Sequence, residues 1–172
     1  MRDRVAFTLI ELLVVLAIIA VLSGLVLGIG HHASNFGQTV RAKAELAAVS
    51  AALESYKRQY GDYPRTNRPD ELLQALIGKR GPTGAIVSGR VFIDLANFRS
   101  GDALNPFLNS AAEIVDPWDQ PYAYAYRSEV PWTNAGYVLY SKGRDGLAAE
   151  LLLGGAIDEL APANADNICL DQ

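Results

Sequence analysis

The chain has 172 residues, of which 50% are hydrophobic and 20% are charged. Its length fits one domain or two small ones, and its formal net charge of −4 argues against nucleic-acid binding, because phosphate recognition needs a basic surface. The sequence has one cysteine, Cys169, so it can form neither an internal disulfide nor a metal site built from several cysteines.

The apolar residues concentrate near the N-terminus. Residues 12–30, LLVVLAIIAVLSGLVLGIG, contain no charged side chain. As a helix this run spans roughly 28 Å, which matches the hydrocarbon core of a bilayer, and it is longer than the apolar region of a secretory signal. Arg2 and Arg4 precede the run and the next basic residue is Arg41, so a transmembrane helix with a cytoplasmic N-terminus is predicted.

An acid, Glu11, stands immediately before this run. An ionised carboxylate inside a bilayer costs a few kcal/mol, and two interpretations follow. Glu11 lies at the interface and reaches water, or it needs a positive partner that its own helix does not supply nearby. The sequence leaves both interpretations open.

Residues 4–13, RVAFTLIELL, resemble the processing site of type IV prepilins and type II secretion pseudopilins, in which Phe and Thr-Leu-Ile-Glu precede a long apolar stretch. The resemblance implies that a prepilin peptidase cleaves between Ala6 and Phe7 on the cytoplasmic side, and that the new N-terminal Phe7 is N-methylated. It also implies that Glu11 pairs with the N-terminal ammonium group of a neighbouring subunit during filament assembly. Ala6 departs from the family pattern, which usually has Gly there.

Residues 35–60 predict an amphipathic helix that continues from the membrane segment. Gly61 and Pro64 end it, because glycine favours the helix C-cap and proline cannot extend the helix. The helix should pack against a sheet through one apolar stripe. Charged residues, among them Glu45, are expected on the other faces of the helix. The stripe has helical spacing and consists of Ala42, Leu46, Val49, Leu53, Tyr56 and Tyr60.

Shorter elements are predicted after this helix. Residues 69–77 predict a short helix that Gly78 stops, and residues 91–95 are a candidate strand. Residues 122–127 alternate Tyr and Ala in the manner of a strand, and residues 137–141 form a second candidate. The last two segments predict an antiparallel hairpin with a long loop.

Three segments of this region are similar, in their order, to the major pseudopilins of type II secretion: YGDYP at 60–64, DPW at 116–118, and YSKGRDG at 140–146. The resemblance implies an α+β, type IV pilin-like fold in which a long N-terminal helix, half transmembrane and half amphipathic, packs on a small antiparallel sheet. The expected organisation is a leader peptide (1–6), a transmembrane segment (7–30), a periplasmic helix (31–60) and a globular head (61–172).

The resemblance also implies a calcium ion, which the major pseudopilins hold in the loop after the second strand. Asp145 matches one family ligand and Asp166 resembles a later one, with backbone carbonyls to complete the six to eight oxygens that Ca²⁺ takes. Residues 147–163 stand where the family usually has a short loop rich in glycine and acids. The alternative interpretation is a simple turn at Asp145 and a solvated acid at Asp166.

The head shows no spacing of nucleophile and base that predicts catalysis, so an enzyme is not expected. We expect a single-pass protein of the bacterial inner membrane with a periplasmic head. It would form a homo-oligomeric periplasmic filament for type II secretion, with minor pseudopilins, the prepilin peptidase and an inner-membrane assembly platform as partners. A type IV pilin for adhesion, motility or DNA uptake is the alternative. Many such pilins close a C-terminal loop with a disulfide, which Cys169 alone cannot do, and this favours the pseudopilin.

Overall fold

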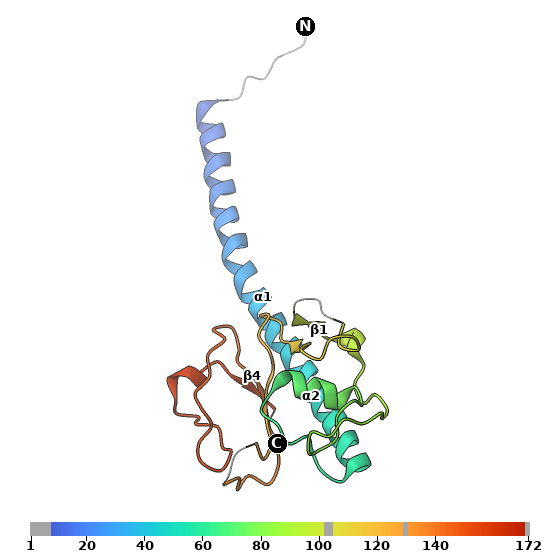
Figure 1. Ribbon diagram of the computed structural model, residues 1–172. Coiled ribbons are helices and arrows are strands. Elements are labelled where there is room, and N and C mark those ends of the chain that lie inside the picture. Colours follow the sequence, from blue (N-terminus) through green and yellow to red (C-terminus); the bar gives the residue numbers. More distant parts are fainter. Residues whose placement is uncertain (1–7, 102–104, 129–130, 171–172) are drawn as a thin grey trace. The chain divides into compact units, whose positions relative to one another are not determined.

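Helix α1, Leu9–Tyr60, is the longest element of the structure (Figure 1). The computed structural model describes residues 8–101, 105–128 and 131–170, and for residues 25–34 it describes the backbone alone. Contacts divide the chain into an N-terminal unit, residues 1–37, and a larger unit, residues 38–172. The other elements, in chain order, are α2 (Pro69–Leu76), η1 (Leu95–Asn97), β1 (Arg99–Ser100), β2 (Ile114–Val115), β3 (Ala123–Ala125), β4 (Val138–Ser141), η3 (Pro162–Asn164) and β5 (Ile168–Cys169).

In the N-terminal unit, every side chain from residue 9 to residue 24 is exposed. Nearly all of them are apolar, so this part of α1 has no polar stripe of the kind that a surface helix of a globular protein carries. In the part of the chain that the structure describes, we find no helix with the length and apolar character needed to cross a membrane.

In the larger unit, the predicted apolar stripe of α1 is confirmed. Ala42, Leu46, Val49 and Leu53 are fully buried in one hydrophobic core. Tyr56 is fully buried against the rings of Tyr60 and Phe92, while Tyr60, the last residue of the predicted stripe, is only half-buried. The helix ends where the sequence predicts, because the amide of Gly61 donates to the carbonyl of Lys57 and its φ of +84° is one that glycine adopts without strain.

The predicted hairpin is also confirmed, as part of a three-stranded antiparallel sheet with the order β3-β4-β5. Tyr124 of β3 pairs with Leu139 of β4, and Tyr140 of β4 pairs with Cys169 of β5. Alternation along β3 places Tyr124 in the core and points Ala123 and Ala125 toward the opposite face of the sheet. The fold is therefore α+β, with helices packed on small antiparallel sheets, as expected.

The strand predicted at residues 91–95 is wrong. The amide of Phe92 donates to the carbonyl of Leu76 at the end of α2, and its ring packs edge-on against Tyr56. Residues 91–95 therefore contact the end of α2 and the aromatic core instead of a neighbouring strand. The next strand in the chain is β1, which pairs with β2.

The expected position of Glu45 on a polar face is also wrong, since its side chain is buried with 6% of its surface exposed. Its carboxylate accepts a hydrogen bond of 2.6 Å from the hydroxyl of Tyr122 and forms an ion pair of 2.6 Å with Arg41. These partners satisfy a charge that would otherwise be costly to bury. Burial, together with the hydrogen bond to Glu45, raises the pKa of Tyr122.

Candidate functional site

The first turn of α1 holds Glu11 in a hydrogen-bonded pair with Thr8. The amide and the hydroxyl of Thr8 donate to Oε2 of Glu11 at 2.9 and 2.8 Å. In return, the amide of Glu11 donates to Oγ1 of Thr8 at 3.3 Å. This is a capping box, in which Thr at the N-cap and Glu three residues later satisfy amides that the helix leaves without partners.

Thr8 was not predicted as a partner of Glu11. The signal was present, because Thr-x-x-Glu before an apolar run is the sequence pattern of a capping box. Glu11 is thus satisfied within its own subunit by neutral donors, and its side chain remains exposed. Ala6, Phe7 and the leader 1–6 lie outside the described residues, so processing there stays a prediction.

A second candidate site is the loop after β4, residues 143–146. Gly143 and Gly146 have φ values of +67° and +68°, which lets the backbone turn sharply at both ends. Between them, the amides of Arg144 and Asp145 donate to Oδ2 of Asp166 at 2.9 and 3.1 Å. The structure therefore brings Asp145 and Asp166 together, although residues 147–163 separate them in sequence.

This loop offers carboxylate and carbonyl oxygens, the ligand type that calcium prefers. Oδ1 of Asp166 is buried without a hydrogen-bond partner among the described residues, so Asp166 is not a freely solvated acid. Oδ1 of Asp145 accepts from the amide of Leu147 at 2.8 Å, as in the turn of the alternative interpretation. Within the described residues no cluster of three His, Cys, Asp or Glu side chains is found, so backbone carbonyls would have to complete the shell of hard oxygens.

Asp116 fixes the start of this loop. Its side chain is fully buried, and Oδ1 accepts from the amides of Trp118 and Gln120, both at 2.9 Å. Oδ2 accepts from Oγ of Ser141 at 2.5 Å, and that Oγ accepts from the amide of Gly143 at 3.1 Å. The sequence suggested only a family resemblance for the DPW segment. In the structure, Asp116 of this segment connects the turn at residues 116–120 to the loop of Asp145 through Ser141.

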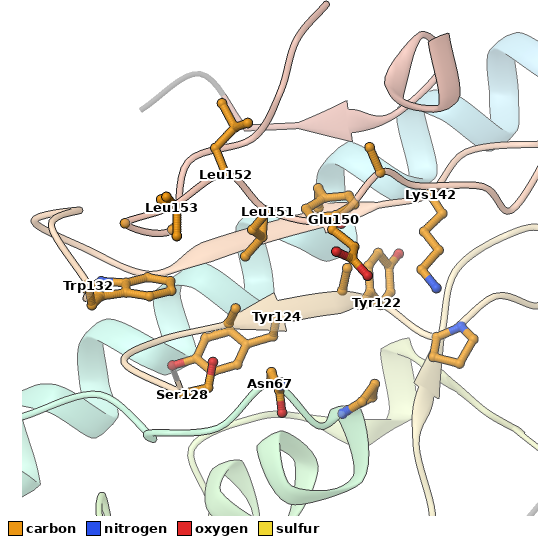
Figure 2. A pocket seen from close by; sticks show the side chains of 18 of the residues that line it. Asn67, Tyr122, Tyr124, Ser128, Trp132, Lys142, Glu150, Leu151, Leu152 and Leu153 are labelled. Carbon is orange, nitrogen blue, oxygen red and sulfur yellow. The ribbon is translucent and has the colours of Figure 1, made fainter. Parts of the chain in front are cut away.

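Residues 149–155 and the strands β3 and β4 line a partly open cavity of about 500 Å³ (Figure 2). The small side chains of Ala123 and Ala125 belong to its lining and leave room there. Figure 2 shows Glu150 and Lys142 toward one end of the cavity and Trp132 at the other. The lining therefore combines apolar walls with two charged groups.

Comparisons with known proteins agree with the N-terminal motif and with the head. Residues 1–27 match the family described as the prokaryotic N-terminal methylation motif. The chain is 31% identical over 166 residues to the type II secretion system core protein G of Pseudomonas aeruginosa, and the match covers 96% of this chain and 98% of the relative. No solved structure matches the chain significantly.

Proposed function

The chain belongs to the pseudopilin family of the type II secretion system core protein G, and we propose that it polymerises into a periplasmic filament that serves type II secretion. The observation that carries this proposal is the similarity over nearly the whole length of both chains. The aligned region includes both the N-terminal methylation motif and the head of this chain. The proposed role is structural rather than catalytic.

Processing is the first step of the proposed function. A prepilin peptidase would cleave between Ala6 and Phe7, and Phe7 would then be N-methylated. The match of residues 1–27 to the methylation motif supports this step. Cleavage would leave a mature chain in which Thr8 is the second residue and Glu11 the fifth.

Anchoring and assembly would use the same surface of α1. Residues 7–30 would hold the subunit in the inner membrane, with a cytoplasmic N-terminus and a periplasmic head. The exposed apolar side chains of residues 9–24 support this step, because they need a covering of lipid before assembly and of neighbouring helices afterwards. Burial against neighbours would offset the cost of leaving the bilayer. Minor pseudopilins and an inner-membrane platform would take part.

Glu11 would set the register of this assembly. Thr8 satisfies its carboxylate with neutral donors, which lowers the cost of keeping an acid in this position. The ammonium group of Phe7 on a neighbouring copy would add an opposite charge, which a capping box cannot supply. In an apolar surrounding that charge pair is favourable only when both partners are present.

We further propose that Asp145 and Asp166 hold a calcium ion. The buried, unpartnered Oδ1 of Asp166 supports this proposal, together with its position beside Asp145. When bound, the ion would supply the positive charge that links the C-terminal segment to the loop after β4. The chain's own amides at residues 144 and 145 already hold the other oxygen of Asp166 in place.

A complementation experiment tests the proposed function. The gene is deleted in its own host, and the full chain is returned on a plasmid. We expect the returned chain to restore export of proteins across the outer membrane and to form filaments that can be pelleted after shearing. Normal export without the chain would contradict a role in type II secretion, and a loss confined to surface motility or adhesion would indicate a type IV pilin.

A further inference from the structure

The head carries a surface that is both acidic and apolar, which we call the acidic lobe, residues 147–163. It contains Glu150, Asp158 and Glu159 and neither Lys nor Arg. Two of its leucines, Leu153 and Leu160, are 91% and 93% exposed. Large apolar side chains with this exposure, surrounded by charges, are typical of an interaction surface.

Hydrogen bonds hold the acidic lobe in place. The amides of Thr133 and Asn134 both donate to the carbonyl of Gly154 at 3.0 Å. At the other side, the side-chain amide of Asn164 donates to the carbonyl of Asp158 at 2.7 Å and its oxygen accepts from the amide of Ala149 at 2.8 Å. The leucines are therefore presented on a fixed surface.

A second surface has the opposite charge, and we call it the basic patch. Residues 79–93 contain Lys79, Arg80 and Arg90 and no acid. Arg80 forms an ion pair of 2.7 Å with Glu71 of α2, whereas Arg90 is exposed and Lys79 is half-buried. The basic patch consists of Lys79, Ile86, Arg90, Val91, Phe107 and Leu108.

The basic patch is also held together by contacts within the head. Nζ of Lys79 donates to the carbonyl of Phe107 at 2.6 Å, which joins the two segments of the patch. Ile86 and Leu108 are 92% and 87% exposed. Ile86 pairs with Arg80, which follows Lys79, and Leu108 follows Phe107, so both lie near Lys79. The guanidinium of Arg90 stacks over the ring of Phe92.

The two surfaces lie on different sides of the head. In Figure 1 the orange and red acidic lobe is on one side of the C-terminal part of α1, and the green to yellow segments of the basic patch are on the other. Two complementary surfaces on different sides of one subunit make a head-to-tail contact, which repeats into an open helical filament when the rotation does not close.

We propose that the acidic lobe of one copy docks on the basic patch of the next copy in the filament. The proposal rests on the proposed filament function and adds a contact between heads to it. The exposed leucines of the lobe would pack against Ile86 and Leu108. The charges would orient the two heads and make their association sensitive to salt.

Cysteine cross-linking tests the contact directly. In the full chain with Cys169→Ser, Leu153→Cys and Leu108→Cys are combined, and filaments formed in the host are oxidised. We expect a ladder of covalent multimers. The matched control combines Leu153→Cys with Arg58→Cys, an exposed position at the end of α1 outside both surfaces, and it should give no ladder.

Charge exchange is the second arm of the test. Lys79→Glu with Arg90→Glu, or Glu150→Lys with Glu159→Lys, should each reduce the yield of pelleted filaments about tenfold, because repulsion replaces attraction at every contact. All four substitutions together should restore the yield. Arg58→Glu, which reverses one charge outside both surfaces, should leave it unchanged.

The outcomes separate the contact from the filament itself. Filaments that form normally but give no ladder, or the same ladder in the control, would overturn the contact and leave the proposed function standing. Cross-linking of Leu153→Cys to another protein alone would assign the lobe to a different partner. If the unaltered chain forms no filaments, both the proposed function and the contact fail.

Discussion

The two parts of helix α1 differ in how their apolar side chains are arranged. In residues 9–24 these side chains cover the whole circumference and are all exposed. In residues 42–56 they form one stripe, which the chain's own head buries completely. A periodic stripe finds its partner within the chain, whereas a uniformly apolar helix needs a partner outside it, either lipid or another helix.

The largest expected effect concerns Glu11, the acid at the start of the uniform part. Glu11→Ala removes both the capping interaction with Thr8 and the charge proposed to meet a neighbouring N-terminus. We expect filament formation to fall more than about tenfold while the chain still inserts in the membrane, since an unsatisfied ammonium group would remain in an apolar surrounding. Pelleted filaments and membrane fractions are compared by immunoblot.

Glu11→Gln separates the cap from the charge, because Gln can also serve in a capping box. Its assembly should be as poor as that of Glu11→Ala. If Glu11→Gln assembles as well as the unaltered chain, the cap alone explains the acid, and pairing with a neighbour is contradicted.

In the head, the largest expected effect is that of Asp116. Asp116→Ala leaves the amides of Trp118 and Gln120 and the hydroxyl of Ser141 without their acceptor. Loss of a buried acceptor of this kind costs about 3 kcal/mol of unfolding free energy, which urea denaturation of the full chain in detergent measures.

Asp119→Asn is the matched control for this change, because Asn also tolerates the φ of +66° at this position. Its side chain is 74% exposed and pairs with Arg99 at the surface, so the expected loss is below about 1 kcal/mol. Equal losses for the two variants would contradict the role given to Asp116. A loss of filaments without a loss of stability would assign Asp116 to assembly instead of the head's interior.

A smaller effect is expected from calcium. Calcium should raise the melting temperature of the full chain in detergent, because the ion binds only the folded loop. Asp166→Asn should abolish this rise, while Glu150→Gln, an exposed acid nearby, should keep it. An unaltered chain whose melting temperature is the same in calcium and in chelator would contradict the proposed site.

The smallest effect is a pH dependence confined to the head. The hydroxyl of Thr66 donates to the carboxylate of Glu71, and Arg80 forms an ion pair with the same carboxylate. Both contacts keep the pKa of Glu71 below its usual value. An acid whose pKa is lower in the folded than in the unfolded chain stabilises the fold when it is ionised. This stabilisation is fully present above the unfolded pKa of about 4.3 and is lost as the pH falls through the lower, folded pKa. Glu71→Gln should therefore melt earlier at pH 7, and the gap should close near pH 3.

Melting curves across this pH range check the prediction. A gap that stays constant down to pH 3 would show that Glu71 acts through packing and not through its charge. Filament yield at pH 7 should not fall in Glu71→Gln, because the contacts of Glu71 with Thr66 and Arg80 lie within its own head.

Local patterns in the sequence predicted much of the fold. The stripe from Ala42 to Tyr56 and the Tyr–Ala alternation of β3 each follow from the period of one element, so both could be read without knowledge of distant contacts. Residues 91–95 look like a strand, but the ring of Phe92 is placed by Tyr56, more than thirty residues earlier in the chain. Such a contact has no local signature.

The candidate site shows the same division. Thr8 and Glu11 form a local pattern that could have been predicted as a capping box. Asp145 and Asp166 could be paired only through a family resemblance, because their approach depends on how residues 147–163 fold between them. The buried state of Glu45 could not be predicted either, since it depends on the hydroxyl of Tyr122 across the core.

The mass of the N-terminal peptide tests the central claim most directly. The full chain is produced in its host, extracted from membranes and digested, and the peptide that contains Glu11 is measured. We expect a peptide that begins with N-methylated Phe7. A peptide that begins at Met1, or at any residue other than Phe7, would contradict processing as a pseudopilin.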